Sequence, residues 1–236
     1  PSWGRARWLS IVGIGEDGAD GLTPAARRLI EGAELVVGGA RHLELAAPLI
    51  GSQLLAWPSP LTSAFPEILA RRGRPVVVLA SGDPFHFGVG STLLRESGID
   101  PAEMLVVPAP SAFSLAAARM GWAQQDTICL SVHGRAHETV VPHLHDGARI
   151  LALSWDETSP KRIAELLVAY GMGHSRMTVL EAMGAKRERV RRVSAEGFAL
   201  EDINPLNTLA IEVVAGPGAR VIPLASGLDD RFDRLP

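Results

Sequence analysis

The chain has 236 residues, a formal net charge of −3 and one cysteine, Cys129. A net negative charge is unfavourable for a protein that binds the phosphate backbone of nucleic acids. A lone cysteine excludes an internal disulfide and any cysteine-based zinc site, and it fits a reducing cytoplasm. No apolar run approaches the ~18 residues that a membrane helix needs, and the first residues lack the layout of a signal peptide. We therefore expect a soluble cytoplasmic protein with no nucleic-acid or membrane partner.

Strand and helix patterns alternate through the first half of the chain. A continuous apolar run over residues 8–14 predicts a buried first strand, and Thr23-Pro24 predicts a helix that ends near Gly32. Further strands are expected at 35–37, 53–56, 76–79 and 104–107, and further helices at 65–72, from about Gly90, and at 111–120. Such alternation favours a mostly parallel sheet covered by helices.

The second half begins in the same way and then changes. Strands are expected at 127–131, 150–153 and 177–181, with a helix at 160–170. Residues 187–193 and 208–214 then predict two strands paired with each other, which favours a mixed sheet. The polar break at 121–126 separates the halves. We expect an N-terminal α/β domain over 1–122, a C-terminal α/β domain over 126–226, and a tail or linker over 227–236.

The loop Ser81-Gly82-Asp83-Pro84, which follows the strand at 76–79, is the strongest candidate for a ligand site. In open α/β sheets, ligands bind outside the carboxyl ends of the strands. Gly82 permits close approach of the backbone, Asp83 offers a carboxylate, and Pro84 stiffens the exit. Asp83 either contacts the charged end of a ligand or braces its own loop, and both interpretations stay open from the sequence.

Residues 13–18, Gly-Ile-Gly-Glu-Asp-Gly, match the G-x-G-x-x-G dinucleotide pattern without its context. A pyrophosphate site needs a helix that begins within the loop, whereas the helix here cannot begin before Thr23-Pro24. Glu16 and Asp17 would also repel the pyrophosphate. A loop with acidic residues suits a ligand that carries positive charge, such as an amino group or a sulfonium. We therefore reject the dinucleotide match, and a nucleotide-binding dehydrogenase stays only as the alternative from another class of enzyme.

Histidines gather after the strand at 127–131. His133 and Arg135 follow it directly, and His133 either caps the loop or meets an anionic substrate. His137, His143 and His145 lack the spacing and the carboxylate partner of a known zinc motif, so we expect a solvated face there. No metal site is predicted.

Five motifs in order resemble the tetrapyrrole methylase family, whose members transfer methyl groups from S-adenosylmethionine to precorrins and related tetrapyrroles. The motifs are VGIG (12–15), SGDPFHFG (81–88), PAPSAFSLAAAR (108–119), SVHGR (131–135) and NPLNTLAIEV (204–213). Within the family, the chain resembles the enzymes that methylate the meso carbons 5 and/or 15 at the precorrin-6 stage of cobalamin (vitamin B12) biosynthesis, on the segments VGGARHLEL (37–45), VHGR (132–135) and PLNTLAIE (205–212). Another tetrapyrrole methylase with a different precorrin substrate is the alternative.

The resemblance implies two α/β domains, S-adenosylmethionine in the cleft between them, S-adenosylhomocysteine as product, and a homodimer. It implies that the cofactor contacts Gly13, Ile14, Gly15, Glu16, Ser81, Gly82, Asp83, Phe85, Ser111, Ala112, Leu153, Ser154, Trp155, Asn207, Thr208 and Leu209. Many relatives have G-x-G-P-G in the first loop, where this chain has Gly15-Glu16-Asp17.

The chemistry of a carboxylate-rich tetrapyrrole adds two further groups of residues. A proton lost from the ring needs an acceptor, for which His133, Asp156 and His86 are the candidates. Arg41, His42, Arg119 and Arg135 are candidate clamps for the carboxylates.

In some relatives a second methyltransferase module, which also carries out a decarboxylation, follows in the same chain. Residues 224–236 resemble the start of that connection. We therefore expect this chain to be the methylase module alone. A cofactor-binding module without its own catalysis is the alternative, if the partner module supplies the chemistry.

Overall fold

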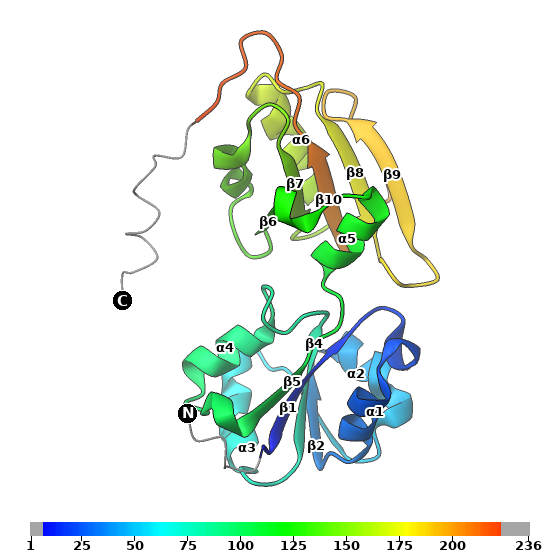
Figure 1. Ribbon diagram of the computed structural model, residues 1–236, viewed down its shortest axis with the longest axis vertical. Helices are drawn as coiled ribbons and strands as arrows, with labels where there is room; N and C mark the ends of the chain where they lie inside the picture. The colour runs from blue at the N-terminus through cyan, green and yellow to red at the C-terminus, as the bar shows by residue number, and fades with distance from the viewer. Residues whose placement is uncertain (1–6, 223–236) are drawn as a thin grey trace. The chain divides into compact units, whose positions relative to one another are not determined.

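The computed structural model describes residues 7–222 and shows two α/β units, each built on a five-stranded sheet (Figure 1). The first unit runs to Ser111 and also includes Gly184–Lys186, and the second comprises Ala112–Met183 and resumes at Arg187. The division therefore falls before helix α5 (Ala112–Met120), whereas the sequence placed it after this helix. The reason is that α5 packs against strands of the second sheet. The expected tail at 227–236 lies outside the described residues.

The first sheet is entirely parallel, as predicted. Its strands are β1 (Leu9–Ile14), β2 (Leu35–Gly38), β3 (Gln53–Ala56), β4 (Val76–Ser81) and β5 (Met104–Val107), in the order β3-β2-β4-β1-β5. Every residue of β1 is buried, which explains its continuous apolar run. The connection from β1 leads towards β2 and the one from β4 leads towards β5, so the direction of winding changes at these two central strands.

Helices cover both faces of this sheet (Figure 1). The helices α1 (Pro24–Glu31) and α2 (Ala40–Ala46) pack on one face, and α3 (Phe65–Leu69) and α4 (Val89–Glu96) pack on the other. Four short 3-10 segments, Gly18–Gly21, Ala47–Leu49, Leu61–Ala64 and Pro101–Glu103, connect them.

The start of α1 and the end of α3 show how local chemistry sets helix bounds. Thr23 accepts the Ala26 N–H through its hydroxyl oxygen, and Pro24 takes the first helical position, as the sequence predicts. Helix α3 is shorter than the predicted 65–72. The N–H groups of Arg71 and Arg72 donate to the carbonyls three residues earlier in the chain, as in a 3-10 helix, and not four residues earlier, as in an α-helix.

The second sheet is mixed, again as predicted. Its strands are β6 (Ile128–Ser131), β7 (Arg149–Leu153), β8 (Arg176–Glu181), β9 (Arg189–Ser194) and β10 (Asn207–Glu212), in the order β6-β7-β10-β8-β9. Only β6 and β7 are parallel neighbours; the other pairs are antiparallel. The 3-10 segments Gln124–Asp126 and His137–His143 and the helix α6 (Ser159–Ala169) complete the unit.

The predicted pairing of residues 187–193 with 208–214 is wrong. Strand β10 lies between β7 and β8, and β9 pairs with β8 at the edge. The compositions explain this arrangement. Five of the six residues of β10 are buried, so the strand needs a neighbour on each side, whereas the arginine-rich β9 suits an exposed edge.

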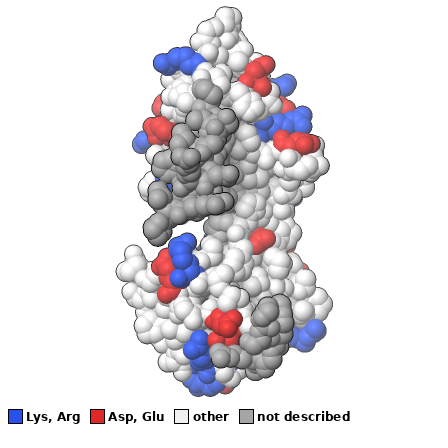
Figure 2. Space-filling model, turned by 60° about the vertical axis from the view of Figure 1, so that its left-hand side comes forward, with Lys and Arg blue, Asp and Glu red and all other residues white. Residues whose placement is uncertain are grey.

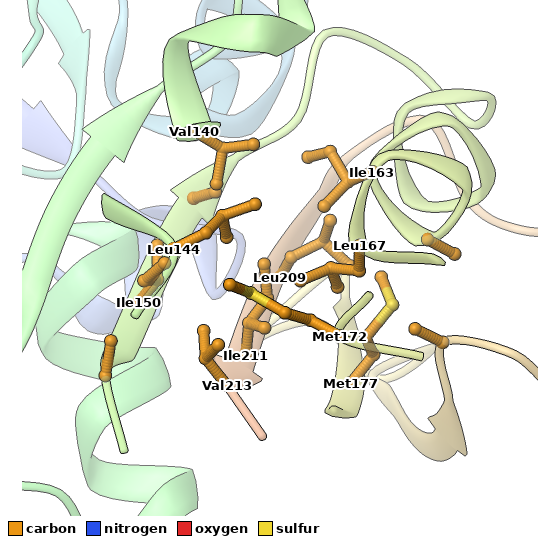
Figure 3. Close-up of a cluster of buried hydrophobic side chains, with 14 of the residues drawn as sticks. Val140, Leu144, Ile150, Ile163, Leu167, Met172, Met177, Leu209, Ile211 and Val213 are labelled. Atoms are coloured by element: carbon orange, nitrogen blue, oxygen red, sulfur yellow. The ribbon is translucent and has the colours of Figure 1, made fainter. Parts of the chain in front are cut away.

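An apolar cluster fills the space between α6 and one face of the second sheet (Figure 3). Side chains from the helix, such as Ile163 and Leu167, point towards Leu209 and Ile211 of β10. The opposite face is covered by α5, whose Phe113 is fully buried. Both faces of the sheet are therefore packed.

Charged side chains of both signs lie close together on the surface (Figure 2). Several form ion pairs within one unit, for example Arg72 with Glu103 and Arg119 with Glu188. Among residues 7–222, no helix is long and apolar enough to cross a membrane.

Candidate functional site

The carboxyl ends of β1 and β4 meet the loop after β5 with backbone against backbone. The Gly82 N–H donates to the Ile14 carbonyl at 3.1 Å, and the Ala109 N–H donates to the Gly82 carbonyl at 3.1 Å. A Cβ on Gly13 would lie 1.9 Å from the Gly82 oxygen and 2.5 Å from the Ala109 nitrogen. Only glycine fits at position 13. We call this junction the first edge.

Gly82 also packs closely against the segment Pro110-Ser111. Its φ of +54° lies in the left-handed region, and a Cβ there would lie 2.8 Å from the Pro110 oxygen and 2.9 Å from the Ser111 Cα. Ser111 is buried, and Ala112 begins α5. The structure therefore brings together the predicted residues of three loops: Gly13 to Glu16, Ser81 to Asp83, and Ser111.

Asp83 braces its own loop. Its Oδ1 accepts the Phe85 N–H at 2.8 Å, its carbonyl accepts the His86 N–H at 3.2 Å, and the Pro84 carbonyl accepts the Gly90 N–H at 2.9 Å. The brace that the sequence left open is thus present. A contact between Asp83 and a ligand stays a prediction.

The same loop presents aromatic rings. Phe85 is 43% exposed and Phe87 is 47% exposed, and the His86 ring stacks on Phe87 with 5.7 Å between ring centroids. Phe87 has a φ of +57°, a conformation that non-glycine residues rarely adopt. The hydrogen bonds around Asp83 and Pro84 hold this conformation, so the rings stand on a fixed backbone.

Ser81 is linked to α2 through two side chains. Its Oγ lies 2.9 Å from His42 Nε2 and accepts from Arg41 at 3.1 Å, and the same Arg41 nitrogen lies 3.2 Å from His42 Nε2. A guanidinium can only donate, so His42 Nε2 is an acceptor and the ring proton belongs on Nδ1. Nδ1 is buried and has no hydrogen-bond partner within the described structure.

The charges of these side chains do not fit the predicted clamp. Burial, together with the charge of Arg41, lowers the pKa of His42 to about 4, so His42 is neutral at physiological pH. Arg41 forms an ion pair with Glu16. Arg41 and His42 therefore connect the first loop to the β4 loop, and the charge of Arg41 is matched within the protein.

Loop ends also gather in the second unit. Strands β6, β7 and β8 end, and β10 begins, at one edge of the sheet, which we call the second edge; Leu153 is paired with Thr208, and Asn207 with Glu181. The predicted Leu153, Ser154, Trp155, Asn207, Thr208 and Leu209 all lie at or next to this edge. Thr208 and Leu209 are buried within the sheet.

Ser154 and Asn207 hold the second edge together. The Ser154 hydroxyl donates to Asn207 Oδ1 at 2.6 Å, and Asn207 Nδ2 donates to the Asn204 carbonyl at 2.9 Å and the Asp156 carbonyl at 3.3 Å. Both side chains are buried. Asn207 thus joins the loop after β7 to the segment before β10.

Trp155 and Asp156 follow in the same loop. The Trp155 side chain is 51% exposed. Asp156 Oδ1 accepts from the Thr158 N–H at 2.9 Å and from the Thr158 hydroxyl at 2.6 Å. The hydroxyl is the main reason that the pKa of Asp156 lies below its ordinary value. A carboxylate held in its ionised form in this way is a weak proton acceptor.

The remaining predicted residues are divided between the two units. His133 and Arg135 are exposed after β6, next to the loop after β7, whereas His86 belongs to the first unit. Arg119, on α5, forms a bidentate ion pair with Glu188 at 2.8 and 2.9 Å, which raises the pKa of Arg119. The structure therefore brings His133 and Asp156 to neighbouring strand ends of the second unit.

Sequence reasoning missed Glu181, a fully buried carboxylate at the end of β8. It accepts from Arg189 at 2.8 Å, from Arg191 at 2.9 Å and from the Asn204 N–H at 2.7 Å. Burial raises the pKa of Glu181, but these three donors outweigh burial and bring it below the ordinary value. Arg191 also donates to the Glu201 carbonyl at 2.9 Å. Glu181 therefore fixes the segment that leads into Asn207.

The first loop does not form a dinucleotide site. Helix α1 begins at Pro24, after the 3-10 segment Gly18–Gly21, so residues 13–18 do not open a helix whose N-terminus could face a pyrophosphate. The structure confirms the expectation that led us to reject the dinucleotide pattern.

A family model described as tetrapyrrole (corrin/porphyrin) methylases matches residues 9–199, from β1 to beyond β9. The chain belongs to this family. Over 223 residues it is 57% identical to a Sinorhizobium protein named precorrin-6Y C(5,15)-methyltransferase [decarboxylating], covering 94% of this chain and 54% of that one. A cobalt-precorrin-7 C(5)-methyltransferase of Salmonella typhimurium is 32% identical, over 77% of this chain and 88% of its own.

A solved structure agrees with these relatives. The precorrin-6Y methylase of cobalamin biosynthesis from Archaeoglobus fulgidus superimposes with a TM-score of 0.64 and 26% identity, over 88% of this tetrapyrrole methylase and 99% of that chain. The present chain spans about half the length of the first curated relatives that it matches, which are covered to 54% and 51%.

Proposed function

We propose that this tetrapyrrole methylase transfers a methyl group from S-adenosylmethionine to a meso carbon, C5 and/or C15, of a precorrin at the precorrin-6 stage of cobalamin biosynthesis. The observation that carries the proposal is that the family motifs lie at strand ends, where Gly13 and Gly82 leave no room for a Cβ. The 57% identity to the Sinorhizobium protein supports the substrate. That relative is about twice as long, so we propose the methyl transfer alone for this chain and not the decarboxylation.

The residues at the first edge fit a cofactor with a cationic sulfonium. The glycines let the loops close on one another at this edge, and Asp83 brings a carboxylate to it, while the charge of Glu16 is matched by Arg41. S-adenosylmethionine, when bound, supplies an already activated methyl group. The protein therefore mainly has to align the reactants and exclude water.

Each unit contributes its own group of proposed cofactor contacts. We propose Gly13 to Glu16, Ser81 to Asp83, Phe85 and Ser111 in the first unit, and Ala112, Leu153 to Trp155 and Asn207 to Leu209 in the second. Asn207 contributes to cofactor binding indirectly, because its amide group is hydrogen-bonded to the Ser154 hydroxyl and the Asn204 carbonyl. Trp155, half exposed on a braced loop, is the side chain best placed for direct contact with the cofactor.

His133 is the proposed proton acceptor. Its side chain is exposed after β6 and makes no hydrogen bond within the described structure, whereas Asp156 is held ionised by Thr158. Arg135, exposed next to it, is the proposed contact for a substrate carboxylate.

Titration calorimetry with S-adenosylhomocysteine tests the cofactor. We expect about one site per chain with a dissociation constant in the micromolar range or tighter. Absence of both heat and thermal stabilisation at millimolar ligand would overturn the proposal.

Mass spectrometry after incubation with the reduced precorrin-6 substrate and S-adenosylmethionine tests the reaction. A gain in mass of one methyl group supports it. Transfer only to an earlier precorrin would instead assign this chain to another step of the pathway. Binding of a nicotinamide cofactor, detected by its fluorescence, would revive the dehydrogenase alternative.

A homodimer and a cytoplasmic location stay predictions from the family and the composition. Analytical ultracentrifugation is the direct test of the homodimer, with a single species at twice the chain mass as the expected result.

A further inference from the structure

Ser159 lies at the centre of a small hydrogen-bond network in the second unit. It is fully buried, and its Oγ accepts the N–H of Trp155 at 2.9 Å and the N–H of Asp156 at 3.3 Å. A hydroxyl oxygen has two lone pairs and one proton. Since both lone pairs are engaged by these N–H groups, the proton points to the third neighbour, His137 Nε2, at 3.0 Å. We therefore assign the Ser159 hydroxyl as the donor and His137 Nε2 as the acceptor of this bond.

His137 is held in place from its own side. It opens the 3-10 segment His137–His143, which contacts α6, and Val140 and Val141 of this segment are buried in the cluster that contains Ile163 and Leu167 (Figure 3). Ser159 is the first residue of α6. Both partners therefore stand on packed elements, and the bond between them has a fixed geometry.

The other end of the network is the loop that carries Trp155. Besides the bonds to Ser159, Asn207 donates to the Asp156 carbonyl at 3.3 Å, and Thr158 donates to Asp156 Oδ1. The Trp155 side chain itself is half exposed. The backbone N–H of Trp155 itself is bound by Ser159.

We propose that His137 is a positioning residue of the site. By taking the Ser159 proton, it directs both lone pairs of Ser159 to the N–H groups of Trp155 and Asp156, and so fixes the direction in which the loop presents the Trp155 indole to the cofactor. The inference rests on the proposed function, in which Trp155 contacts the cofactor. It gives a role to a histidine that the sequence placed on a solvated face.

Two variants separate the acceptor from the rest of the side chain. His137→Leu removes the acceptor, whereas His137→Gln keeps an oxygen that can accept the Ser159 proton. His145→Leu is the matched control, since His145 is exposed and the only described hydrogen bond of its side chain is a long one of 3.4 Å to the neighbouring Asp146 carbonyl.

The first readout needs no ligand. We expect the Trp155 and Asp156 amides to exchange hydrogen about tenfold faster in His137→Leu and near the parent rate in His137→Gln and His145→Leu, as for loss of one hydrogen-bond partner. The imidazole nitrogen shifts of the parent protein should show Nε2 unprotonated. Unchanged exchange in His137→Leu, or a protonated Nε2, would overturn the inference.

The second readout is the affinity for S-adenosylhomocysteine. His137→Leu should weaken it about tenfold, His137→Gln much less, and His145→Leu not at all. In a Trp155→Ala background, His137→Leu should have almost no further effect, because the side chain that His137 positions is gone. An equal loss in both backgrounds would overturn the inference.

The Trp155→Ala variant also separates this inference from the proposed function. If Trp155→Ala leaves the affinity unchanged, the proposed cofactor contact fails. If Trp155→Ala weakens binding and His137→Leu does not, only the positioning role fails.

Discussion

The first edge is held by backbone against backbone, at Gly13 and Gly82, whereas the second edge is held by side chains such as Ser154, Asn207 and Glu181. The topologies explain this difference. In the parallel first sheet, neighbouring strands end together and their loops close directly on one another. In the mixed second sheet, β10 starts where β7 and β8 end, so a residue such as Asn207 faces two neighbouring strand ends at once. The first edge should therefore be sensitive to added volume, and the second to a lost polar partner.

Gly13→Ala should have the largest effect. The new methyl group would meet the Gly82 oxygen and the Ala109 nitrogen, which are both backbone atoms. We expect the free energy of unfolding to fall by about 3 kcal/mol or more. Urea unfolding measures this, with Gly51→Ala as the control, since a Cβ on Gly51 would meet nothing within 4 Å. Equal stability of the two variants would contradict the tight closure of the first edge.

Glu181→Gln should come next, because it leaves Arg189 and Arg191 without their buried counter-charge. We expect a loss of about 2–3 kcal/mol in the free energy of unfolding. Glu201→Gln, at an exposed position, is the control and should change little.

The pH dependence of the same variant gives an independent check. The folded protein holds the pKa of Glu181 below its unfolded value of 4.5, so the folded state binds fewer protons. The stabilisation that ionised Glu181 gives to the folded state is therefore fully present above pH 4.5, and it is lost as the pH falls through the pKa of Glu181 in the folded protein. The parent protein should show this acid step, and Glu181→Gln should lack it. An acid step of equal size in both proteins would contradict the role of Glu181.

His42 tests the exception in the first edge, where side chains rather than backbone join α2 to Ser81. Its pKa falls from 6.5 in the unfolded chain to about 4 in the folded protein, so the unfolded chain takes up the proton first as the pH is lowered. Between about pH 7.5 and about pH 5.5 this should remove roughly 1.3 kcal/mol of stability. His42→Phe should lose this part of the pH dependence, and His145→Phe should retain it. Identical pH profiles for the parent and His42→Phe would show that the histidine is not held neutral.

Asp83 should give the smallest effect. Asp83→Ala removes the acceptor for the Phe85 N–H and should cost about 1 kcal/mol, whereas Asp83→Asn keeps an acceptor oxygen and should cost less. The affinity of Asp83→Asn for S-adenosylhomocysteine then separates the two roles. Unchanged affinity indicates a brace alone, and weaker binding by a stable variant indicates that the carboxylate charge faces the ligand.

Several features of this protein follow from the sequence by itself. The buried run of β1, the start of α1 at Thr23-Pro24 and the mixed nature of the second sheet depend on neighbouring residues and on periodicity, which the sequence displays directly. The motif loops at strand ends follow in the same way, as does the late start of the first helix, which excluded a dinucleotide site.

The tertiary structure alone decided which partners the polar side chains take. Arg41 and His42 resemble cations that would bind a substrate, but Glu16 forms an ion pair with Arg41, and His42 contacts Ser81, which lies 39 residues further along the chain. His137 and Ser159 form a hydrogen bond although they are 22 residues apart in the chain. The pairing of β9 and β10 with β8 depends on which strands are buried. Such contacts arise when packing brings distant segments together and removes water from polar groups. The protonation state of His42 and the hydrogen bond of His137 to Ser159 therefore depend on their tertiary surroundings, which a local sequence pattern does not show.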